Sequence, residues 1–386
     1  MPTAINPYEG VNWDNQYKGQ FHTHTLNCKV ENDGTVLWPD GRIMDNQGAI
    51  TQEPGTEWER GDPPSESYEL SDGDVYSSDG HSYTDTVIDL YHQKGYSILA
   101  ITDHDTGYHY GTNARTSWPW TIWGRNASDL GMVAIEGNEI SQPHHWNSLF
   151  NDLPFWQGFN QSDVDKGLEE VGKRNGSAFM AHPHRYNWTL SHYADLYTKH
   201  KHLTGLEVCS QGLRNGGRGE YDRNIWDNIN SFMLNKVFLT AKTVWGYSND
   251  DMHRIFHPTN FHHMYKNYQF ILADELSEDG VRKALDEGKL YFCVEPNANG
   301  DALAPHITDL IVDEETKVIS IEHNGDVVEW YTEKTELVHT GDTFSYANFD
   351  KVFVRAQISN EHGVTYTQPF AMYHPLSYKW GAVFDS

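Results

Sequence analysis

The stretch Ser97–Thr106, SILAITDHDT, guides the interpretation of the rest of the chain. It begins with a largely apolar, β-branched run over residues 97–102 and changes abruptly to Asp103-His104-Asp105. Such a run is typical of a buried parallel strand, which would place the polar residues at its carboxyl end. In α/β barrels the catalytic groups lie at that end of the strands. We therefore expect other strands of this chain to end in His, Asp or Glu.

Other strand-like runs also end in residue types that bind metals. They are FHTHT at 21–25, EGNEIS at 136–141, FMAHPHR at 179–185 and GYSNDDMH at 246–253. His22 and His24 stand at positions i and i+2, so both would lie on one face of a strand and could reach the same ion. Each run alone is weak evidence, but together they predict a cluster of metal ligands.

Composition limits the possible partners. The 386 residues carry a net charge of −27, from 28 basic and 55 acidic residues, which argues against binding to nucleic acid or an anionic membrane. An anionic substrate would be repelled unless the site carries local positive charge, which bound divalent metals would supply. No run of 18 apolar residues and no signal peptide are present. We expect a soluble protein, either cytoplasmic or exported after removal of a leader.

The cysteine and aromatic content gives only weak information about the fold and the substrate. Cys28, Cys209 and Cys293 are odd in number and lack CxxC spacing, which argues against a disulfide scaffold or a structural zinc cluster. The 13 Trp and 22 Tyr residues would suit a carbohydrate-rich substrate or environment.

Helices and strands alternate through most of the chain after an irregular arm over 1–20 and a long polar, lid-like insertion over about 26–77. Predicted helices cover 84–94, 162–174, 221–234 and 277–287, with Gly95 and Gly288 closing the first and last. Predicted strands cover 96–102, 132–136, 177–181, 203–208, 237–245 and 290–294. This succession of βα units predicts a barrel over residues 1–302.

The pattern changes after about residue 303. Alternating runs at 307–312, 317–322, 327–332, 351–358 and 364–370 are separated by turn signals such as Asn324-Gly325. No helical period is visible, so residues 303–386 are predicted to form a small antiparallel β-sandwich.

Taken in order, the motifs HTHT, SSDG, AITDHD, GNEIS, HHWN, AHP and SNDDMH resemble the PHP (polymerase and histidinol phosphatase) family over residues 20–300. The resemblance implies a distorted (β/α)7 barrel with a site for up to three divalent metals. It also implies nine ligands: His22, His24 and Asp251 for the first metal, Glu139 bridging the first and second, His145 and His182 for the second, and Asp79, His104 and His253 for the third. Asp103 would orient a neighbour by hydrogen bonding.

Two of these assignments have rivals. The family has only a few residues between HxHT and SDG, whereas about fifty separate His24 from Asp79 here. Asp33-Gly34 is the alternative to Asp79, but it lacks the helix and strand that should follow. His144 is the alternative to His145, which is preferred because the following residues match the family's H-x-N context. Glu207, at a strand end, is more typical of a hydrogen-bonding core residue than of a ligand.

The mixed imidazole and carboxylate set favours Mn²⁺, Zn²⁺ or Fe²⁺ over Ca²⁺. The predicted function is hydrolysis of a small phosphomonoester or phosphodiester by a metal-bound hydroxide. His184 could protonate the leaving group, although an ordinary surface histidine is the simpler interpretation. Arg185 could bind a phosphate oxygen, and a structural ion pair is an equal alternative for it. Arg214 and Arg218 are weaker candidates for binding an anion. The alternatives are hydrolysis of an ester, amide or glycosidic substrate, and a non-catalytic carbohydrate-binding protein; the oligomeric state is not indicated.

Overall fold

The structure is a computed structural model of the 386-residue chain. It describes residues 1–25, 83–105, 117–141, 143–153, 161–186, 188–210, 220–235, 242–253, 264–297 and 300–374. Between residues 29 and 77 it also describes short strands: β3 (Lys29–Val30), β4 (Val36–Leu37), β5 (Ile43–Met44), β6 (Ile50–Gln52), β7 (Ser67–Glu69) and β8 (Val75–Ser77). The rest of the predicted insertion lies outside the described residues.

The first α/β unit is built around the stretch quoted above. Helix α1 (Thr84–Gln93) ends near Gly95, whose φ of +74° suits the C′ position. Strand β9 (Ile98–Ala100) follows and pairs in parallel with β2 (Tyr17–Gln20) and β10 (Val133–Ile135). The apolar face of α1, formed by Val87, Ile88 and Tyr91, is fully buried in the same core as Leu99. The predicted parallel strand therefore exists and is buried.

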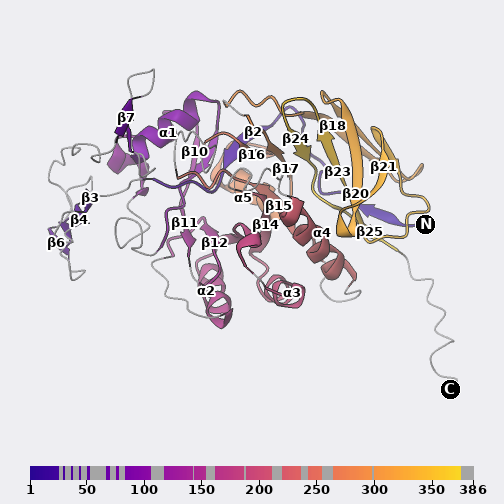
Figure 1. Ribbon diagram of the computed structural model, residues 1–386, viewed down its shortest axis with the longest axis horizontal. Coiled ribbons are helices and arrows are strands. Elements are labelled where there is room, and N and C mark those ends of the chain that lie inside the picture. Colours follow the sequence, from indigo (N-terminus) through magenta and orange to yellow (C-terminus); the bar gives the residue numbers. More distant parts are fainter. Residues whose placement is uncertain are drawn as a thin grey trace.

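A second sheet has five strands in the order β11-β12-β13-β14-β15. Their bounds are Gly137–Ile140, Trp146–Leu149, Ser177–Met180, Leu203–Cys209 and Trp245–Ser248. Helices α2 (Gln161–Lys173), α3 (Leu190–Lys199) and α4 (Glu220–Asn235) lie along one side of this sheet (Figure 1). They bury an apolar cluster that includes Leu168, Tyr197 and Trp226.

The remaining strands are mostly antiparallel. Strands β16 (Asn267–Ile271) and β17 (Leu290–Val294) pair with each other, and helix α5 (Glu278–Glu287) connects them. Strand β17 also pairs with β24 (Val364–Tyr366), which continues the sheet through β23 (Phe353–Ser359), β25 (Phe370–Tyr373) and β20 (Val327–Thr332). Strand β21 (Glu336–Thr340) pairs with β20. Strands β18 (Ile307–Asp313), β19 (Val318–His323) and β22 (Thr343–Ser345) form a separate small sheet.

The amino-terminal arm differs from the prediction. The sequence predicts an irregular segment over residues 1–20, but β1 (Thr3–Ile5) pairs antiparallel with β25 and lies beside it in Figure 1. Its partner stands some 370 positions later in the chain, so no local pattern could indicate the pairing.

The chain is therefore a mixed α/β protein with many strands and few helices. The distorted (β/α)7 barrel, the separate β-sandwich and the boundary at 302/303 stay predictions. Within the described residues, no helix combines the length and apolar character needed to cross a membrane.

Candidate metal centre

Side chains of the predicted ligand set converge where strands of the two sheets end. His22 and His24 follow β2, His104 follows β9, and Glu139 lies in β11. His145 directly precedes β12, His182 follows β13, and Asp251 and His253 follow β15. These eight residues make up three groups, each with ligand atoms within 4.8 Å of one another. The ninth predicted ligand, Asp79, and its rival Asp33 lie outside the described residues.

The largest group contains His22, Glu139, His182 and Asp251, all buried. The i, i+2 spacing places both histidines beside one carboxylate, since Nε2 of His22 and Nε2 of His24 lie 3.2 Å and 3.1 Å from the same atom, Oδ1 of Asp251, although His24 belongs to another of the three groups. The other groups are His24 with His104 and His253, and His104 with Glu139 and His145.

Glu139 lies at the centre of the arrangement. Its carboxylate oxygens are 2.7 Å from Nδ1 of His104, 2.7 Å from Nδ1 of His145 and 3.0 Å from Nε2 of His182. Burial by itself would raise the pKa of Glu139, but the charges of the surrounding histidines outweigh it and hold that pKa well below its usual range. Glu139 is therefore an ionised carboxylate that faces imidazoles belonging to more than one group.

Backbone pairing brings the two sheets together at this point. Isolated parallel bridges link Thr23 with Met252 and His104 with Glu139. Two of the candidate ligands also have positive φ angles, +23° at His182 and +48° at Asp251. Such angles are uncommon outside glycine and concentrate at functional sites, where the surrounding contacts hold them in place.

The histidines differ in the direction of their pKa shifts. Burial lowers the pKa of His182 to about 4 and, together with the charge of His104, lowers the pKa of His24. Burial opposes protonation of His22 as well, but three carboxylates, with Glu207 the strongest, raise its pKa. Metals bind the neutral imidazole, so metal binding at His22 would release a proton.

The donor set fits a transition-metal ion. Nε2 of His22 is buried between Asp251 and Glu139, at 3.2 Å and 3.4 Å, without the geometry of a hydrogen bond to either. Several imidazole nitrogens and two carboxylates that face one buried point match the ligand preference of Zn²⁺, Mn²⁺ or Fe²⁺. These residues could therefore hold divalent metals.

The structure bears on the predicted role of Asp103 and on the choice between His144 and His145. Asp103 accepts hydrogen bonds from the backbone N–H and the hydroxyl of Thr25, at 2.6 Å and 2.9 Å, which matches an orienting role. His144 contacts the carbonyl of His145 and the hydroxyl of Tyr193 and stacks on Tyr186, so its ring is engaged outside the ligand groups. His145, the preferred candidate, points to Glu139.

The two predicted catalytic residues lie beside the centre. Nδ1 of His184 is 2.7 Å from Oδ2 of Asp222 in α4, and its ring centroid is 6.2 Å from that of His182. Arg185 is exposed. The contact with Asp222 carries no local sequence signal, because the two residues are 38 positions apart. Arg214 and Arg218 lie outside the described residues.

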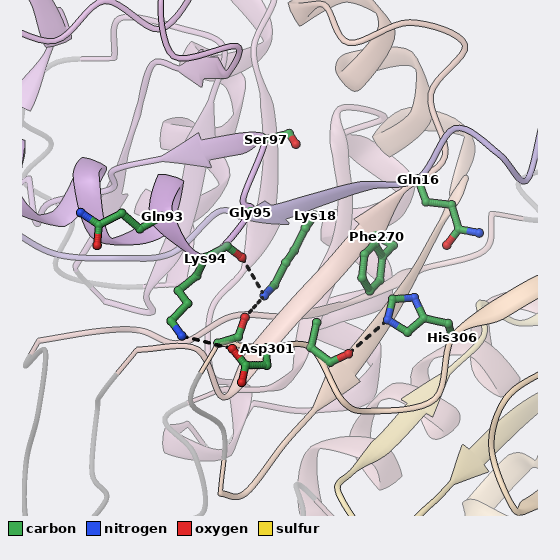
Figure 2. A pocket seen from close by; sticks show the side chains of 11 residues that line it. Gln16, Lys18, Gln93, Lys94, Gly95, Ser97, Phe270, Asp301 and His306 are labelled. Carbon is green, nitrogen blue, oxygen red and sulfur yellow. Dashed lines mark hydrogen bonds and ion pairs between the residues drawn. The ribbon is translucent and has the colours of Figure 1, made fainter.

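A separate pocket lies at the opposite ends of β2 and β9 (Figure 2). Lys18, at the start of β2, donates to the carbonyl of Gly300 at 3.0 Å, and Lys94 pairs with Asp301 at 3.1 Å. The candidate ligands follow the other ends of these strands, so this pocket is not part of the metal centre.

No family model matches the chain, and no curated protein matches it. Among solved structures it is similar to a two-domain protein from Bacteroides vulgatus that contains a predicted PHP-like metal-dependent phosphoesterase, with 14% identity and a TM-score of 0.46 over 96% of this chain and 89% of that one.

Two further structures cover about half of this chain. One is a candidate metal-dependent phosphoesterase from Bifidobacterium adolescentis, with 15% identity and a TM-score of 0.33 over 54% of this chain and 92% of that chain. The other is an amidohydrolase from Chromobacterium violaceum with bound sulfate and no metal, with 14% identity and a TM-score of 0.29 over 48% of this chain and 87% of that chain.

Proposed function

We propose that this protein is a metal-dependent hydrolase with a PHP-type barrel that cleaves a small phosphomonoester or phosphodiester. The observation that carries the proposal is the convergence of eight predicted ligands, from segments up to 231 positions apart, into three groups, two of which contain Glu139. Chance placement of histidines on a surface would not bury four ligand atoms within 4.8 Å of one another.

The candidate ligands would be distributed over three metal sites. His22, His24, Glu139 and Asp251 would hold the first metal, Glu139, His145 and His182 the second, and His104 and His253, with Asp79, the third. Bound Mn²⁺, Zn²⁺ or Fe²⁺ would activate water and neutralise charge on the reacting phosphoryl group. Positive charge supplied in this way would let a protein with a net charge of −27 admit a small anionic substrate.

His184 and Arg185 remain the candidates for contact with the substrate. The Asp222 carboxylate orients the His184 ring through Nδ1, and Nε2 of His184 makes no hydrogen bond to any described residue. A ring held in this way could give a proton to the leaving oxygen. The exposed guanidinium of Arg185 could bind a phosphate oxygen in a charge-assisted hydrogen bond.

The test is turnover of p-nitrophenyl phosphate and bis(p-nitrophenyl) phosphate by Mn²⁺-loaded protein, with His104→Ala as the control. We expect hydrolysis of at least one ester and a decrease of about 100-fold or more in the control, because removal of a ligand weakens charge stabilisation in the transition state. The ester that is hydrolysed identifies the substrate class.

If protein shown to contain metal hydrolyses neither ester, the proposal is contradicted in its phosphoesterase form. Hydrolysis of a carboxylic ester, amide or glycoside under the same conditions would then identify a different hydrolase on the same centre. Protein that binds no metal at all would favour a non-catalytic role.

A further inference from the structure

We propose that Glu207 is a positioning residue of the metal centre, which orients the ring of His22 and the backbone of His182 and thereby sets the affinity for metal. Glu207 belongs to none of the three ligand groups. The inference rests on the proposed metal-dependent function and assigns a role to a side chain outside its ligand set.

The carboxylate of Glu207 lies in β14, is fully buried and uses both oxygens. Oε1 lies 2.7 Å from Nδ1 of His22 and accepts a hydrogen bond from Nδ2 of Asn249 at 3.0 Å. Oε2 accepts a hydrogen bond from the backbone N–H of His182 at 2.8 Å. One side chain therefore contacts two candidate ligands from different strands.

The contact with His22 determines which ring nitrogen faces the metal. A carboxylate can only accept, so Nδ1 of His22 donates its proton to Glu207, and Nε2 is the nitrogen that can bind a metal once it has released its own proton. Nε2 is the atom that points to Asp251 and Glu139. Metal-bound imidazoles characteristically donate their other N–H to a carboxylate or carbonyl, which fixes the tautomer and makes the ligand more basic.

The contact with His182 acts on the backbone. His182 has φ +23° and ψ +65°, a conformation that side-chain-bearing residues seldom adopt. The hydrogen bond from its N–H to Oε2 of Glu207 opposes relaxation toward a regular strand end. Nε2 of His182 is thereby kept 3.0 Å from Glu139.

Asn249 extends the arrangement to a third segment. Its Nδ2 donates to Glu207, while its Oδ1 accepts from the backbone N–H of Phe21 at 3.0 Å. Phe21 directly precedes His22. Glu207 and Asn249 therefore hold the first ligand segment both by its ring and by its backbone, and the pair acts on the geometry of the centre without touching the ion.

The test compares Glu207→Gln with the matched control Glu295→Gln. Glu295 is also buried, and it accepts from Tyr268 and from the backbone N–H of Ala304, outside the ligand groups. An amide offers a single oxygen to the three donors around position 207, so at least one of them loses its acceptor.

Zn²⁺ affinity is measured by competition with a chromophoric chelator, and the visible absorption of Co²⁺-loaded protein reports ligand geometry. We expect affinity to fall about 10- to 100-fold in Glu207→Gln, with an altered Co²⁺ spectrum. Glu295→Gln should bind like wild type and show the wild-type spectrum.

A second measurement does not depend on whether Glu207→Gln folds. In ¹⁵N-histidine NMR of the Zn²⁺-loaded wild-type protein, the His22 ring, assigned by its loss in His22→Gln, should carry its proton on Nδ1. A proton on Nε2 instead, or wild-type affinity in Glu207→Gln, would overturn this inference and leave the proposed function standing. Wild-type protein that binds neither Zn²⁺ nor Co²⁺ would overturn both.

Discussion

Glu139 is the residue whose loss should affect the centre most. It is an ionised, buried carboxylate that contacts histidines from several strand ends, and in the proposed function it would be a ligand at two metal sites. We expect Glu139→Gln to lose at least one metal equivalent per chain, because the amide supplies no negative charge and offers only one oxygen. Activity toward the ester that wild type hydrolyses should fall at least about 100-fold.

Metal content measured by inductively coupled plasma mass spectrometry checks the first expectation. Glu322→Gln, at an exposed position of β19, is the control for a general effect of lost negative charge. Full metal content in Glu139→Gln would show that Glu139 is not a ligand.

At the residue scale, sequence motifs predict the candidate ligands, but not the side chains that contact those ligands. His22 and His24 are recognisable because two histidines at i and i+2 share a strand face. Glu207 contacts His22 across 185 positions of sequence, so its role depends on which strands become neighbours. A single polar residue in a buried strand gives no sign of that partner.

At the scale of elements, one buried ion pair joins α4 to β23. Nε and Nη2 of Arg355 lie 2.7 Å from the two carboxylate oxygens of Asp227, and both side chains are fully buried. The guanidinium also lies 5.1 Å from the ring of Trp226. Removal of one partner leaves an uncompensated buried charge, so Asp227→Ala should lower the free energy of unfolding by about 3–5 kcal/mol.

Urea denaturation followed by circular dichroism measures this change. The double variant Asp227→Leu/Arg355→Met removes both charges and keeps apolar volume, so it should recover most of the loss. If the double variant were as unstable as Asp227→Ala, loss of packing and not the unpaired charge would be the cause.

Lys18, at the start of β2, supplies a prediction about pH. Its side chain is almost fully buried, and its Nζ lies 4.2 Å from the ring centroid of Tyr96 and donates to Gly300 (Figure 2). Burial lowers the pKa of Lys18 to about 8, although Glu295 and Asp250 act in the opposite direction.

Because the folded-state pKa of Lys18 lies below the unfolded value of 10.5, the unfolded chain holds more protons between these two values. Stability from this residue therefore rises as the pH increases from about 8 toward 10.5. Relative to Lys18→Met, the wild-type free energy of unfolding should gain about 2 kcal/mol between pH 7.5 and 9.5. A difference that stays constant across that range in urea titrations would contradict the assigned pKa.

Element boundaries could be predicted where local chemistry marks them. Gly288 has a φ of +73° and closes α5, and Gly95 follows α1 in the same conformation. Local residue patterns do not determine strand direction. The βα pattern predicts parallel strands, but residues 137–149 form an antiparallel hairpin of β11 and β12. Periodicity reports which face is buried, and not which strand lies alongside.

At the scale of the whole molecule, the sequence pattern predicts the mixed α/β class but not how far one sheet continues. The C-terminal strands alternate in the way expected of an antiparallel sheet, yet β24 pairs with β17, and β25 pairs with β1 at the other end of the chain. These pairings link segments that are far apart in sequence, and their register depends on tertiary packing, which no local window contains.

The metal centre connects these distant parts, which leads to a prediction for the whole fold. His22, Glu139, His182 and Asp251 stand at the ends of strands from both sheets. An ion that binds only the folded chain stabilises it by about 2.7 kcal/mol at a free concentration 100 times its Kd. Dialysis against a chelator should therefore lower the Tm by about 3 °C, and Zn²⁺ or Mn²⁺ should restore it.

Differential scanning calorimetry of metal-free and reloaded protein measures this shift. Asp251→Asn is the matched control, since it removes one carboxylate from the largest ligand group. The rise in Tm on metal addition should be smaller in this variant than in wild type. The Tm values of the two metal-free proteins are compared separately. Equal Tm values for metal-free and reloaded wild type would mean that the strand ends are held by protein contacts alone. The isolated bridges at Thr23 and His104 and the buried carboxylate of Glu207 are among the protein contacts that join the two sheets.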